Sequence, residues 1–186
     1  MYENRNIGPG VLLASAPMIR DPNFRRTVIL LCETGDDGSF GLVLNRPLPF
    51  QSEELVEMLH GQSPDLFLGG PVQPDTLHYV HNLPELIEDG TPIADGVFWG
   101  GNFETVKAAG DLIDFGDVQM RFFLGYSGWA DGQLEAELEN NDWLVIPPNH
   151  QFVFETDAEK LWSRVVASLG GEYKLFANFP ADPRLN

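Results

Sequence analysis

The chain of 186 residues is poor in several residue types, and each scarcity excludes a class of protein. It has one cysteine, Cys32, so no disulfide can form within the chain, as is typical of proteins in reducing compartments. Residues 1–6 show no charged stretch followed by an apolar core. No apolar run reaches the roughly 20 residues that span a bilayer. We therefore expect a cytosolic (cytoplasmic) protein without a secretory signal or membrane segment.

Basic residues are also scarce, with 11 Lys and Arg against 28 Asp and Glu, which gives a net charge of −17. Duplex binding depends largely on lysines and arginines that neutralise phosphates, and an anionic membrane attracts the same residues. Arg20, Arg25 and Arg26 lie within seven positions and form at most a small basic spot. The charge therefore disfavours direct nucleic-acid binding and membrane attachment.

Short apolar segments bounded by turn residues indicate an α+β fold with a mainly antiparallel sheet, in one domain over residues 1–186. Helices are predicted over 53–60, 103–113 and 158–169, and between Asp131 and Asn140, with Ser52, Asn102 and a Thr156–Glu159 capping box at their starts. The segment 84–95 is predicted as an acidic loop. Strands are predicted over residues 10–16, 27–32, 40–44, 65–68, 76–81, 96–99, 120–126, 142–147 and 152–154.

The stretch 122–138 is the most distinctive part of the chain. Its apolar beginning predicts the end of a buried strand. Gly125, Gly128 and Gly132 then predict a glycine-rich turn, since glycine tolerates positive φ and close backbone approach. Asp131 is placed to cap the helix that follows.

Reactive side chains do not form a catalytic or metal-binding pattern. Ser127 lies in Gly125-Tyr-Ser-Gly-Trp129, where the second glycine comes one place too early for a hydrolase nucleophile elbow, so a turn residue is favoured. His78 and His81 are three apart on a predicted strand and face opposite sides, so they cannot chelate one ion together. We predict no catalytic residue, metal ligand or cofactor.

Four polar residues flank predicted strand ends and form the candidate ligand site: Asn45, Arg46, Gln133 and Glu135. Polar side chains at strand ends can share a pocket. A structural role is the favoured alternative, in which Arg46 pairs with a carboxylate such as Glu135 and the amides bind loop backbone.

Several motifs together resemble the YqgE/AlgH family of bacterial proteins, over residues 8–186. They are the segments GVLLASAP at 10–17, DPNF at 21–24, GLVLNRP at 41–47, GGPV at 69–72, GYSGW at 125–129 and GQLE at 132–135. Two positions depart from the family pattern: Ser127, where alanine is more usual, and 130–131, where a glycine–proline turn is common. Alanine at position 127 in relatives argues further against a catalytic serine.

The resemblance implies an α+β domain whose sheet curls into a pseudo-barrel with flanking helices, in a bacterial cytosolic protein. It implies no reaction. Family members are described as transcriptional regulators, yet the chain shows no helix-turn-helix pattern. We expect an interaction or regulatory protein that acts through a protein partner or a small ligand. The alternatives are an enzyme acting on a small uncharged or cationic molecule, with Glu135 as general base, and a transcriptional regulator.

Overall fold

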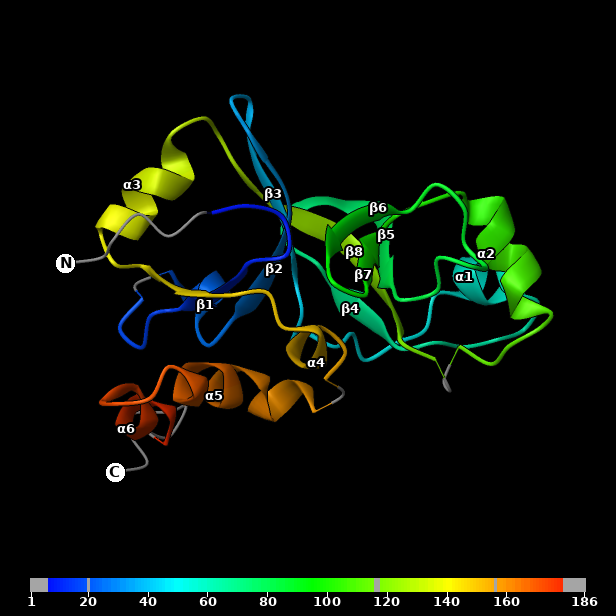
Figure 1. Cartoon of the computed structure of the whole chain (residues 1–186). Coiled ribbons are helices and arrows are strands. Elements are labelled where there is room, and N and C mark those ends of the chain that lie inside the picture. The colour runs from blue at the N-terminus through cyan, green and yellow to red at the C-terminus, as the bar shows by residue number, and fades with distance from the viewer. Residues whose placement is uncertain (1–6, 20, 116–117, 156, 179–186) are drawn as a thin grey trace.

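The computed structural model describes residues 7–19, 21–115, 118–155 and 157–178, and a nine-stranded sheet runs through them (Figure 1). The strand order is β6-β7-β5-β8-β3-β2-β1-β9, and β4 lies beside β8 as the one parallel pair among these residues. The strands are β1 Leu12–Ser15, β2 Val28–Gly35, β3 Gly38–Val43, β4 Leu66–Leu68, β5 Val72–His81, β6 Thr91–Ala94, β7 Val97–Trp99, β8 Met120–Trp129 and β9 Trp143–Ile146. The predicted α+β fold with a mainly antiparallel, curled sheet is confirmed.

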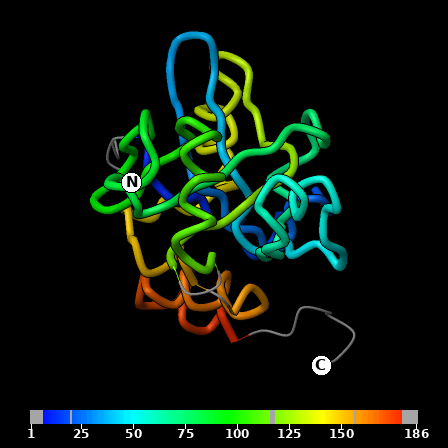
Figure 2. Tube along the Cα trace, turned by 90° about the vertical axis from the view of Figure 1, so that its right-hand side faces the viewer, coloured from blue at the N-terminus to red at the C-terminus, as the bar shows by residue number. Residues whose placement is uncertain are grey.

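Helices cover the sheet in three places (Figure 1). They are α1 Glu53–Met58, α2 Phe103–Gly110, α3 Gln133–Glu139, α4 His150–Val153, α5 Ala158–Ser168 and α6 Tyr173–Ala177, with a 3-10 turn, η1, at Pro22–Phe24. Helices α5 and α6 lie below β1 and β2, α3 lies above them, and α1 and α2 lie together at the far end of the sheet. The view in Figure 2 shows the β2–β3 hairpin projecting away from these C-terminal helices.

Strand alternation sends neighbouring side chains into different cores. Leu12 and Ala14 of β1 pack in the cluster that includes Trp162 of α5, whereas Leu13 packs in the cluster that includes Leu134 of α3. A third cluster joins β5 and β8 to α1 and α2. The sheet is therefore buried on both faces at β1 and β2, which explains why those segments read as continuous apolar runs.

Strand β8 is the centre of the sheet, because it pairs with β3, β4 and β5. The predicted glycine-rich turn is wrong here: the strand continues through Gly125 and Gly128 to Trp129. Gly125 has φ +66, and a Cβ on Gly69 would lie 2.2 Å from its carbonyl oxygen. Gly69 and Gly125 thus allow two backbones to approach closely within the sheet, rather than forming a turn.

The helix starts predicted from the sequence are confirmed where a side chain caps the helix. Ser52 accepts from Leu55 N and Asn102 from Glu104 N, as predicted. Thr156 lies outside the described residues, and Asp157 is the N-cap of α5. Asp131 does not cap α3, whose N-cap is Gly132 at φ +70.

Two predicted elements are wrong. Residues 150–153 form helix α4 instead of a strand at 152–154, because the side chain of Asn149 caps it by accepting from Phe152 N. Residues 91–94, predicted as loop, form β6, which pairs with β7 and becomes the sheet edge.

Candidate functional site

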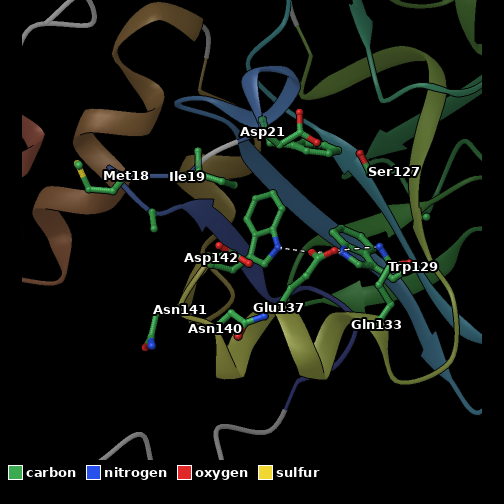
Figure 3. Close-up of a pocket in the computed structure, with 14 residues that line it drawn as sticks. Met18, Ile19, Asp21, Ser127, Trp129, Gln133, Glu137, Asn140, Asn141 and Asp142 are labelled. Atoms are coloured by element: carbon green, nitrogen blue, oxygen red, sulfur yellow. Dashed lines mark hydrogen bonds between the residues drawn. The ribbon is translucent and has the colours of Figure 1, made fainter.

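A cavity of about 740 Å³ lies between the segment that precedes β2, the end of β8, helix α3 and the start of β9 (Figure 3). Its walls come from residues 16, 18, 19, 21 and 24, from 127–129, and from residues 133, 137 and 140–143. The sheet places β1 between β2 and β9, so the ends of strands far apart in sequence meet here. The volume falls in the range of small-ligand sites.

The carboxylate of Glu137 is the polar centre of this cavity (Figure 3). Its Oε2 accepts hydrogen bonds from the indole Nε1 of Trp129 at 2.8 Å and of Trp143 at 2.7 Å. Its Oε1 accepts from Nε2 of Gln133 at 2.9 Å. Buried indole N–H groups generally require an acceptor, so the glutamate satisfies both tryptophans at once.

Aromatic packing fixes the position of these donors. The rings of Trp129 and Trp143 meet edge to face with centroids 6.0 Å apart, and Phe24 packs on Trp143 at 5.5 Å. The two tryptophans are 6% and 4% exposed. Oε2 of the carboxylate is thus held by two buried indoles, whereas Oε1 is bound by the exposed Gln133.

Helix geometry decides which residues of α3 reach the cavity. Gln133 and Glu137 are four apart, so they lie on one face, and both line the cavity. Leu134 is buried against the sheet. Glu135 is exposed and is not among the lining residues. Gln133 also accepts from Ala130 N at 3.1 Å, which closes the turn before the helix.

Asn45 and Arg46 lie at the end of β3 and bind the segment that precedes β2. Asn45 accepts from Val28 N at 2.9 Å and donates to the Arg26 carbonyl at 2.8 Å. Arg46 donates to the Arg25 carbonyl and to Thr27 Oγ1, and burial lowers the pKa of its guanidinium. Neither residue is among those that line the cavity.

The four residues predicted from the sequence are therefore not all brought together. Gln133 lines the cavity, while Asn45 and Gln133 both bind backbone groups, as the structural alternative expected of the two amides. Arg46 bonds to a carbonyl and a hydroxyl, not to Glu135. A ligand-binding role for the set as a whole stays a prediction.

The charge of the cavity is negative. Asp21, Glu137 and Asp142 line it, and its described lining includes no lysine, arginine or histidine. Asp21 accepts from Asn23 N at 2.8 Å, which fixes the η1 turn at the rim. A carboxylate offers roughly four acceptor positions, and Glu137 uses three of them. One position therefore remains for a donor on a bound molecule.

The reactive side chains singled out in the sequence lie in structural positions. Ser127 is 2% exposed, pairs with Gly41 across the sheet, and donates to the Gly69 carbonyl at 3.3 Å. His78 packs against the rings of Phe40 and Tyr126, while His81 packs on the other face. Among the residues that the structure describes, no three His, Cys, Asp or Glu side chains are grouped to hold a metal ion.

Sequence reasoning missed Glu137 and Trp143. The available signal was helical spacing: Gln133 and Glu137 share a face, whereas Gln133 and Glu135 do not. The motif at 132–135 drew attention to Glu135 instead.

Among the residues that the structure describes, no helix is long and apolar enough to cross a membrane.

Comparison with known proteins places this fold in a family. A family model described as AlgH-like matches residues 12–174. The UPF0301 protein of Chlorobium limicola is 42% identical over 181 residues, which cover 96% of this chain and 95% of that protein. The UPF0301 protein of Cytophaga hutchinsonii is 40% identical over 181 residues, covering 95% of this chain and 98% of the relative.

Two solved structures have the same fold. The crystal structure of protein DIP2367 from Corynebacterium diphtheriae superimposes with a TM-score of 0.77 at 25% identity, over 96% of this chain and 95% of the other. The solution structure of AlgH from Pseudomonas aeruginosa superimposes with a TM-score of 0.71 at 29% identity, over 97% of this chain and 98% of the other. The class is an α+β protein with an open, curled sheet. The chain belongs to the AlgH-like (UPF0301) family, as the sequence motifs predicted.

Proposed function

We propose that the chain is a binding protein that acts through a protein partner or a small ligand, and that the cavity beside Glu137 takes a positively charged group. The observation that carries the proposal is the carboxylate held by two buried indoles at the wall of a 740 Å³ cavity. A group fixed in this way needs no reorganisation when a ligand arrives.

The chemistry of the lining favours a cation. Three carboxylates face no basic side chain among the described lining residues, and the chain as a whole carries −17. A guanidinium or ammonium group would be attracted over long range and would find a free acceptor position on Glu137. A lysine or arginine side chain of a partner protein has the same chemistry as a small cationic ligand.

Binding is better supported than catalysis. Ser127 is buried in the sheet and donates to a carbonyl, so it lacks the exposure and the base that a nucleophile needs. The oxygens of Glu137 already accept three hydrogen bonds, which suits a fixed acceptor more than a proton carrier. The net charge opposes contact with phosphates, so the proposed binding role involves a partner or ligand instead of DNA.

The indole N–H groups give a direct test. n-Butylguanidinium is titrated into ¹⁵N-labelled protein while the Nε1–H resonances of Trp129 and Trp143 are followed, and uncharged n-butylurea serves as the neutral isostere. We expect saturable shifts of both resonances with the cation and none with the urea. The Glu137→Gln variant should weaken binding at least about tenfold. Glu139 is an exposed residue of the same helix, so the matched Glu139→Gln change should leave the affinity for n-butylguanidinium unchanged.

A charged hydrogen bond of about 1.5–3 kcal/mol corresponds to a Kd of roughly 6–80 mM. The proposal is therefore wrong if both resonances stay fixed up to about 200 mM cation at constant ionic strength. Equal shifts with guanidinium and urea would contradict the charge argument specifically.

A further inference from the structure

A second cavity, of about 660 Å³, lies at the opposite end of β8 from the first, and an arginine stands in its wall. Residues 61–65, 67, 114, 115 and 118–121, together with Phe154, surround it. Arg121 of β8 lines this cavity and is 7% exposed. It is the most buried lysine or arginine among the described residues, so the groups that stabilise its charge matter.

The guanidinium of Arg121 is held in a fixed position. Nη1 donates to the Val153 carbonyl at 2.9 Å and Nη2 to the Leu44 carbonyl at 2.6 Å. Its Cζ lies 4.0 Å from the ring centroid of Phe67 and 5.7 Å from that of Phe123. Two carbonyls and a ring face therefore orient the planar group before any ligand binds.

Among the described residues, no carboxylate forms an ion pair with Arg121. Asp65 acts on it only from a longer distance. Burial lowers the pKa of Arg121 to about 10, so the group is still charged at neutral pH. Buried charges in proteins are normally paired, because burying an unpaired one costs several kcal/mol. Described residues accept hydrogen bonds from two of its five N–H groups, and the other donors suit an anion.

We propose that this cavity binds a free apolar α-amino acid, whose carboxylate pairs with Arg121 and whose side chain packs on the aromatic wall. The fork of a guanidinium matches a carboxylate with two parallel hydrogen bonds. Phe67 and Phe115 supply apolar surface beside it.

The acidic residues of the cavity select a zwitterion over a simple anion. Asp65 and Asp114 line the same cavity as Arg121, so its described lining carries two formal negative charges against one positive charge. A bare carboxylate would be repelled, whereas an α-ammonium group beside the carboxylate would be attracted. A molecule without net charge also meets no long-range repulsion from a chain of charge −17.

A ligand series on the unaltered chain tests these roles one at a time. L-Phenylalanine, L-phenylalaninamide (no carboxylate) and 3-phenylpropionate (no ammonium) are titrated separately. Binding is read from the backbone amide resonances of residues 62, 63, 65–67 and 118–121. We expect L-phenylalanine to bind at least about tenfold more tightly than either analogue. Equal affinity for all three, or no saturable shift with L-phenylalanine up to about 20 mM, would overturn the proposal.

Variants separate the two charged contacts. Asp65→Asn should remove the preference for L-phenylalanine over 3-phenylpropionate. Asp75 is exposed and lies outside the cavity, so Asp75→Asn should retain this preference. Arg121→Lys keeps the charge but loses the fork, so affinity for L-phenylalanine should fall at least about tenfold. If that variant does not fold, the ligand series and Asp65→Asn still decide. An unchanged preference in Asp65→Asn would contradict the zwitterion assignment.

The test is independent of the cavity beside Glu137. Glu137→Gln should leave the binding of L-phenylalanine unchanged, because Glu137 does not line the second cavity. Failure of guanidinium binding at the first cavity would therefore leave this proposal standing, and the reverse also holds.

Discussion

Truncation of Glu137 should destabilise the protein far more than truncation of any neighbouring glutamate. In Glu137→Ala the indole N–H groups of Trp129 and Trp143 lose their common acceptor, and Gln133 loses one partner. Both tryptophans are buried, so their donors cannot turn towards bulk water.

The magnitude follows from the two indole bonds. A hydrogen bond to a charged acceptor contributes about 1.5–3 kcal/mol, and the loss of a partner costs a buried donor a similar amount. Water can enter from the cavity and replace part of the loss, so the lower end applies to each bond. We expect a loss of about 2–4 kcal/mol for Glu137→Ala. In Glu137→Gln the carbonyl oxygen can still accept from both indoles, so the loss should be about 1 kcal/mol.

The assay is equilibrium urea unfolding followed by tryptophan fluorescence, with a check that the m-value is unchanged. Glu139→Ala is the matched control, since it removes an exposed carboxylate near the same helix end. Its effect should stay within about 0.5 kcal/mol. If Glu137→Ala unfolds at the same urea concentration as Glu139→Ala, the carboxylate does not hold the indoles and the description of the site is wrong.

Three further outcomes follow from the structure. Gly69→Ala should lower the free energy of unfolding in urea by about 3 kcal/mol or more, since its Cβ would lie 2.2 Å from a backbone oxygen. Gly132→Ala has open space around it and should lower this free energy by about 1 kcal/mol, because its φ is positive. Desolvation lowers the pKa of His78 from 6.5, so as the pH falls the unfolded chain takes up this proton before the folded chain does, and stability decreases below pH 6.5. His78→Phe should reduce this decrease when the urea midpoints of unfolding at about pH 7.5 and about pH 5.5 are compared. Burial raises the pKa of Cys32, so its thiol should react with a disulfide reagent only as fast as the protein opens, and a rate equal to that of a free thiol would contradict this.

Much of the fold could be predicted because local signals and burial agree. The runs at 27–32 and 142–147 are apolar because β2 and β9 are buried strands, and Ser52 and Asn102 cap helices with their own side chains. Prediction failed where a tertiary contact overrides the local pattern. The glycines on β8 predicted a turn, but Gly125 instead lies where the backbone at Gly69 and Gly70, far away in sequence, comes close to the strand.

The candidate site was predicted only in part, for a related reason. Gln133 was found because a motif surrounds it, and it does line the cavity. Glu137 was missed because its role depends on Trp129 and Trp143, which α3 and the return of the chain into β9 bring together. Arg121 drew no attention, since a single arginine within an apolar strand gives no sign of the cavity that the folded chain forms beside it.

The most direct test of the proposed binding role is a crystal structure of the protein soaked with n-butylguanidinium. We predict that the guanidinium lies within hydrogen-bond distance of the Glu137 carboxylate, between the η1 turn and helix α3. Ordered guanidinium only at other surface carboxylates, with none beside Glu137, would contradict the account.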